Sequence, residues 1–87
     1  MEKKQNRPIT VGQMKSGRAL VGWTLADLRD ASGLSDMTLK RLEGGEIGQP
    51  LGGTSTTRNK LTGALEAAGV IFIDENGEGP GVRLRKA

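Results

Sequence analysis

The chain has 87 residues, enough for one domain with a small core, and it contains neither cysteine nor histidine. Thiolate chemistry, the commonest general base and the commonest metal ligands are therefore absent, so we expect no enzyme, no catalytic residue, no metal and no cofactor. Thirteen basic against ten acidic residues give a net charge of +3, a mild bias toward polyanions. No apolar run approaches the ~20 residues of a membrane span and no signal peptide is recognisable, so we expect a cytoplasmic protein with no membrane contact.

Residues 1–8 are polar and basic without hydrophobic periodicity, which is typical of a flexible arm. Two roles remain open for this arm. It is either a solvated terminus or a contact to phosphate through Lys3, Lys4 and Arg7.

A first helix is predicted over residues 9–21, with Thr10 as its N-cap. The residues that share its core-facing stripe are Val11, Met14, Arg18 and Val21. Gly12 and Gly17 each weaken a helix by roughly 1 kcal/mol relative to alanine, so this helix depends on packing against other elements.

Two short helices follow between residues 24 and 43, separated by a turn at Gly33. Thr24 and Ser35 stand where N-caps belong, and leucines recur at i, i+3 in each segment. Gly33 accepts a positive φ at little cost, and Leu34 after it can fill a core under the turn. The pattern predicts a helix-turn-helix.

A loop with five glycines, residues 44–53, leads into a further helix over residues 54–68. The loop is either a floppy connector or a segment that orders on DNA or on a second subunit. The helix has an amphipathic stripe formed by Leu61, Ala64, Leu65 and Ala68. Its N-terminus can present Thr57 and Arg58 to phosphate.

The tail predicts a β-hairpin with strands at residues 70–74 and 81–86 around a turn. A lone hairpin is marginal in water, so this one either packs on its own helices or pairs with a second copy. For a homodimer the candidate contact residues are Val70, Ile71, Phe72, Ile73, Val82 and Leu84.

The helix after Ser35 is expected to turn a polar face outward, because Leu39 and Leu42 face the core. That outward face carries Met37, Lys40, Arg41 and Gly44. A guanidinium such as Arg41 forks onto guanine O6 and N7, and Met37 can contact a thymine methyl group. A merely solvated face is the alternative, and Lys15 and Arg29 are expected to be solvated.

These segments resemble the phage-repressor/Cro-like (XRE) helix-turn-helix family. The resemblance rests on GWTLADL at residues 22–28, ASGLS at 31–35 and TLKRLEG at 38–44, and on a tail similar to that of short bacterial members. The tail segments are AGVIFIDENG at 68–77 and GPGVRLR at 79–85. The resemblance covers roughly residues 9–86 and implies DNA binding by a dimer.

The family pattern also implies residue roles. The positions of Arg18 and Glu43 typically pair, which implies a buried structural salt bridge between the first helix and the end of the recognition helix. Ser35, Asp36, Met37 and Arg41 stand at positions that reach bases or phosphate, and Gly44 stands where a backbone N–H meets phosphate. The full set of expected DNA contacts is Ser35, Asp36, Met37, Thr38, Lys40, Arg41, Gly44, Thr57 and Arg58.

Two residues depart from the family pattern. Leu25 stands where similar proteins often have a glutamine that anchors phosphate, so that contact is in doubt here. Asp36 is acidic where relatives often have a basic or small residue, which suggests a contact to cytosine, a water-mediated contact or only a helix cap.

The expected fold is mainly α: a four- to five-helix repressor-like helix-turn-helix domain (residues 9–69) between the flexible basic arm (1–8) and a C-terminal β-hairpin (70–87) that serves dimerisation. The expected function is that of a bacterial or phage transcription regulator, located at the nucleoid. It binds operator half-sites in double-stranded DNA as a homodimer through a recognition helix at residues 35–43 in the major groove. The alternative is an antitoxin- or antiactivator-type module whose tail or loop binds a partner regulatory protein.

Overall fold

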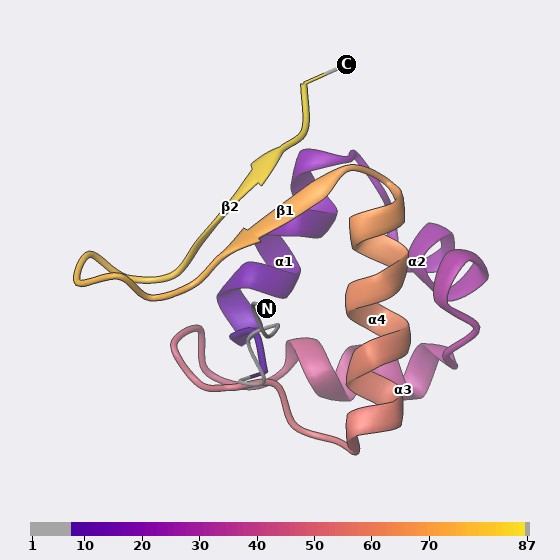
Figure 1. Cartoon of the computed structure of the whole chain (residues 1–87). Helices are drawn as coiled ribbons and strands as arrows, with labels where there is room; N and C mark the ends of the chain where they lie inside the picture. The colour runs from indigo at the N-terminus through magenta and orange to yellow at the C-terminus, as the bar shows by residue number, and fades with distance from the viewer. Residues whose placement is uncertain (1–7, 87) are drawn as a thin grey trace.

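The computed structural model describes residues 8–86, and this range contains four helices followed by an antiparallel hairpin (Figure 1). The elements are α1 (Val11–Leu20), α2 (Leu25–Ser32), α3 (Asp36–Glu43), α4 (Ser55–Ala67), β1 (Val70–Ile73) and β2 (Gly81–Leu84). The expected class, mainly helical with a C-terminal hairpin, is confirmed. Residues 1–7 of the expected arm lie outside the described residues. Within residues 8–86 no helix combines the length and the apolar character needed to cross a membrane.

Each helix begins at a hydroxyl residue that caps its first turn. Thr10, Thr24, Ser35 and Thr54 each accept a hydrogen bond from the backbone N–H three residues further on. In α1 and α2 the side chain at that third position also accepts from the N-cap N–H, which completes a capping box. The N-caps expected at Thr10, Thr24 and Ser35 are confirmed, and α1 and α4 are slightly shorter than predicted.

The turn between α2 and α3 is built on Gly33, whose φ of 76° lies in the left-handed region that glycine tolerates best. Leu34 follows and is buried, as predicted. Both short helices contribute to the same core, and α2 also packs on α4 (Figure 1).

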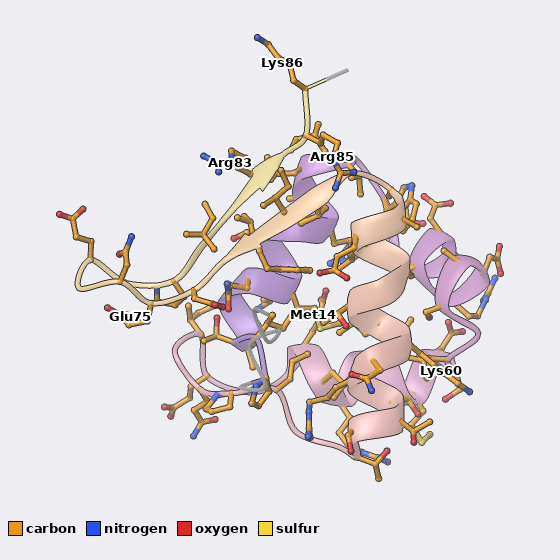
Figure 2. The ribbon with its side chains drawn as sticks, viewed as in Figure 1. Met14, Lys60, Glu75, Arg83, Arg85 and Lys86 are labelled. Atoms are coloured by element: carbon orange, nitrogen blue, oxygen red, sulfur yellow. The ribbon has the colours of Figure 1, made fainter. Side chains whose placement is uncertain are left out.

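The core is one cluster to which all four helices, the loop after α3 and β1 contribute. Its buried members are Val11, Met14, Leu28, Leu34, Leu39, Leu42, Leu51, Leu61, Leu65 and Val70. Figure 2 shows Met14 near the centre of the molecule. Burying one such side chain contributes roughly 1.5–3 kcal/mol, so this cluster supplies the main drive for folding.

The glycine-rich loop after α3 is held by contacts to α1 and to the core of its own chain, which contradicts the view of it as a floppy connector. Its carbonyls at Ile47 and Gln49 accept hydrogen bonds from the N–H groups of Gly12 and Val11, each at 2.9 Å. Leu51 is only 2% exposed and lies in the core. The physical reason is that the first N–H groups of α1 have no partner within the helix, and the loop supplies acceptors for two of them.

The hairpin lies across α1 and beside the end of α4 (Figure 1). Its register pairs Val70 with Leu84 and Phe72 with Val82. Val70 is fully buried, and Phe72 and Val82 pack against the core. The inner face of the hairpin is therefore part of the core of its own chain.

Two residues of α1 allow this close packing. Gly17 is buried, and a Cβ atom placed there would lie 3.3 Å from Cγ1 of Val70, so the missing side chain makes room for β1. Gln13 donates its amide hydrogens to the carbonyls of Ile73 (3.1 Å) and Gly81 (2.9 Å), one at the end of each strand. The hairpin is thus fixed to α1 both by packing and by hydrogen bonds.

Candidate nucleic-acid interface

The outward face of α3 has the composition that the sequence predicts. Leu39 and Leu42 are buried, whereas Met37, Lys40 and Arg41 are exposed, Met37 to 68%. Neither Lys40 nor Arg41 forms an ion pair with any residue in the range 8–86. This face therefore presents two uncompensated positive charges and one flexible apolar side chain.

Ser35 and Thr38, at the start of α3, are joined by two hydrogen bonds. The Ser35 hydroxyl accepts from the Thr38 N–H at 3.1 Å and donates to the Thr38 hydroxyl oxygen at 3.0 Å. The predicted contact residues Ser35 and Thr38 thus build the helix N-terminus, and the Ser35 hydroxyl hydrogen is already used.

Asp36 forms an ion pair with Arg29 of α2 across the turn, with 3.3 Å between Arg29 Nη1 and Asp36 Oδ2. The side chain of Arg29 is solvent-exposed, as expected, and this surface ion pair adds to that expectation. A hydrogen bond to Asp30, then the negative charges of Asp36 and Asp30, raise the pKa of Arg29. The positive charge of Arg29 offsets part of the negative charge that Asp36 places at the N-terminus of α3.

The other end of α3 is braced by the predicted salt bridge. Arg18 Nε lies 2.7 Å from one oxygen of Glu43 and Nη2 lies 3.0 Å from the other, while Nη1 donates to the Trp23 carbonyl at 2.9 Å. The pair is partly buried rather than fully buried, with side-chain exposures of 24% and 11%. The hydrogen bond to Glu43 raises the pKa of Arg18, because it stabilises the charged guanidinium.

The start of α4 lies beside the last turn of α3, because a Cβ atom on Gly53 would contact both Leu42 and Thr57. Thr57 is half-buried, and its hydroxyl oxygen accepts from the Thr54 hydroxyl. Arg58 is half-buried and donates from Nη1 to the Gly53 carbonyl. Both predicted contacts thus have structural partners, and Arg58 ties α4 to the preceding loop.

Gly44 and Leu25 complete the set of expected positions. The N–H of Gly44 donates to the Arg41 carbonyl at 3.2 Å, so it is used within the chain rather than free for phosphate. Leu25 is half-buried and packs against the core, which gives its side chain a structural role.

The residues predicted for dimerisation divide into two groups. Val70 is 1% exposed in the core of its own chain, which leaves little of it for a subunit contact. Phe72 and Val82 pack against that core and are half-buried. Ile71 and Ile73 lie half-buried on the outer face, and Leu84 is 45% exposed. The dimer itself stays a prediction, with Ile71, Ile73 and Leu84 as its most accessible apolar candidates.

Gln13 is an organising residue that the sequence predictions did not include. The sequence does indicate the role of Gln13 in capping α1, because Thr10 and Gln13 have the spacing of a capping box. The donation from Gln13 to the hairpin had no such signal, since its partners are backbone carbonyls 60 and 68 residues away.

Neither a protein-family model nor a curated protein matches this chain. The functional conclusion therefore rests on the residues and geometry of α3 and its surroundings.

Proposed function

We propose that the chain is a sequence-specific DNA-binding transcription regulator that inserts α3 into the major groove. One observation carries the proposal: α3 exposes Met37, Lys40 and Arg41 on one side, while Asp36 beside them has a counter-charge. A surface of this kind suits a polyanion with readable base edges.

The rigidity of α3 supports this use. The Ser35 cap holds one end of the helix, and Glu43 is bound to Arg18 at the other. A recognition element on a fixed helix loses little conformational freedom on binding, so more of the contact energy appears as affinity. Tight joining of α2 and α3 at Gly33 and the repressor-like sequence pattern favour the same function.

The side chains have distinct expected roles. Arg41 forks onto a guanine, and Met37 contacts a thymine methyl group. Lys40 contacts phosphate and contributes affinity without sequence information. Arg41 should therefore control specificity, and Lys40 should control the salt dependence of binding.

The experiment is selection from a pool of random duplex DNA by the purified full chain, followed by affinity measurements on the enriched duplex and on an unrelated one. Arg41→Ala should cost about 1–3 kcal/mol on the enriched duplex and much less on the unrelated one. Lys40→Ala should weaken both and reduce the salt slope by about one.

Lys15→Ala is the matched control, because Lys15 is an exposed cation on α1 rather than α3. It should leave the discrimination between the two duplexes unchanged. The proposal fails if selection enriches no common sequence, or if Arg41→Ala weakens both duplexes equally.

A further inference from the structure

β2 has a free edge. The Arg85 N–H donates to the Gly69 carbonyl at 2.7 Å, and the register pairs Arg83 with Ile71. Because hydrogen-bonded pairs alternate along an antiparallel ladder, the main-chain groups of Val82 and Leu84 point away from β1. Residues 8–86 contain no third strand in this sheet, so those groups have no strand partner there.

A groove runs beside this edge. It has a volume of about 280 Å³, and the residues that line it include Gly12, Ser16, Ile47, Gly48, Gly81 and Val82. The small residues Gly12 and Ser16 come from α1, while Ile47 from the loop is 59% exposed and supplies an apolar wall. The groove can therefore receive apolar side chains of a strand placed next to β2.

Charge changes sign along the edge. Arg83, Arg85 and Lys86 are exposed at the C-terminal end of β2, and none of them forms an ion pair with another described residue. Figure 2 shows Arg83 and Lys86 directed away from the body of the molecule. Near the hairpin turn, Asp74 and Glu75 line an adjoining hollow.

A second copy of this chain fits the edge poorly. If two copies pair antiparallel with Arg83 at the centre of symmetry, Arg83 lies opposite Arg83 of the other copy. If Leu84 is at the centre, Arg83 lies opposite Arg85. Like charges directly opposite each other are destabilising in both cases. In the register centred on Val82, Leu84 lies opposite Pro80, which has no N–H to donate. The edge is therefore protected against self-pairing, as edge strands in many proteins are.

We propose that the free edge of β2 binds an extended acidic segment of a partner protein, which adds as a third strand. Main-chain groups of the segment pair with Val82 and Leu84, its carboxylates lie opposite Arg83 and Arg85, and its apolar residues enter the groove beside Ile47. The end of the segment near Asp74 is neutral or basic. This surface does not depend on DNA binding, because α3 and the C-terminal end of β2 lie at opposite ends of the molecule (Figure 1).

The test uses the full chain and a short, fluorescently labelled synthetic peptide in which glutamate alternates with valine. Fluorescence anisotropy should show binding, and amide exchange by NMR should slow at Val82 and Leu84 on peptide addition. Arg83→Glu combined with Arg85→Glu should weaken binding at least about tenfold. Both arginines are exposed, so this variant should keep its fold, which the NMR spectrum verifies.

Control peptides and variants distinguish edge pairing from charge attraction alone. A peptide that is N-methylated on the amides facing β2 keeps its charge but cannot donate main-chain hydrogen bonds to the strand. If this peptide binds as tightly as the unmethylated one, the proposal is overturned. Lys40→Glu combined with Arg41→Glu on α3 should leave peptide binding unchanged. The proposal is also overturned if a peptide with lysine in place of glutamate binds equally well, or if random duplex DNA competes with the peptide for Arg83 and Arg85. A third contrary result would be a dimer on sedimentation in which the Val82 and Leu84 amides are already protected without peptide.

Discussion

Arg18 and Glu43 form an ion pair with two hydrogen bonds that fixes the last turn of α3 to α1. We expect Arg18→Met to lower the free energy of unfolding by about 1–3 kcal/mol, less than for a fully buried pair because a quarter of the Arg18 side chain is exposed. Glu43→Gln should cost less, since an amide still accepts a hydrogen bond. Urea denaturation followed by circular dichroism measures both, and unchanged midpoints would contradict a bracing role.

The contact of Gln13 with both strands predicts a local effect on the hairpin. Gln13→Ala should cost about 2–3 kcal/mol, because it removes two donated bonds and half of the capping box. Gln13→Glu keeps the acceptor for the Thr10 N–H but places a carboxylate against two carbonyls. With Gln13→Glu, amide exchange should therefore accelerate in β1 and β2 but not in the first turn of α1. Equal acceleration in both places would show that only global stability changed.

Gly17 and Gly63 form a matched pair of helical glycines with opposite expected outcomes. Gly63 on α4 is exposed with open space around it, so Gly63→Ala should stabilise the fold by about 0.5–1 kcal/mol. Gly17→Ala gains the same helix propensity but places a methyl group 3.3 Å from Val70, and we expect a net destabilisation of about 1 kcal/mol. Thermal melts compare them, and a stabilised Gly17→Ala variant would mean that β1 moves aside easily.

The loop after α3 is predicted to contribute to stability through Leu51. Leu51→Ala should cost about 2–5 kcal/mol because this side chain is buried in the core. Ile47→Ala, in the same loop but 59% exposed, should change stability little. Similar small effects for both variants in chemical denaturation would restore the view of the loop as a connector.

The pair between Arg29 and Asp36 predicts an indirect effect on DNA binding, which rests on the proposed function. Arg29→Ala should weaken binding to the selected duplex several-fold, because Asp36 is left without its counter-charge near phosphate. Asp36→Asn in the same chain should restore most of the affinity. A loss that Asp36→Asn fails to restore would instead assign a direct phosphate contact to Arg29.

Local signals in the sequence were sufficient for much of the fold. A hydroxyl residue before each apolar stripe marked the helix starts at Thr10, Thr24 and Ser35, and Gly33 marked the turn. The salt bridge between Arg18 and Glu43 came from the family resemblance, because no local pattern links residues so far apart.

The features that the sequence did not predict depend on tertiary contacts. Gly12 and Gly17 were predicted only to destabilise the first helix. In the structure, the missing side chain of Gly12 makes room for the loop, and that of Gly17 makes room for the hairpin. The loop looked mobile because its glycines suggest freedom, whereas its carbonyls bond to α1. The ion pair of Arg29 had no local signal in the sequence, because its partner Asp36 lies across the turn on the next helix.

The two bonds from Gln13 to the hairpin also bear on the order in which the chain folds. Their acceptors lie 60 and 68 residues further along, and contacts of such long range form late because loop closure precedes them. A chain whose helices have packed but whose hairpin has not yet docked leaves Val70 and Phe72 without their packing partners. Refolding at high protein concentration should therefore lose more material to aggregation when hairpin docking is weakened.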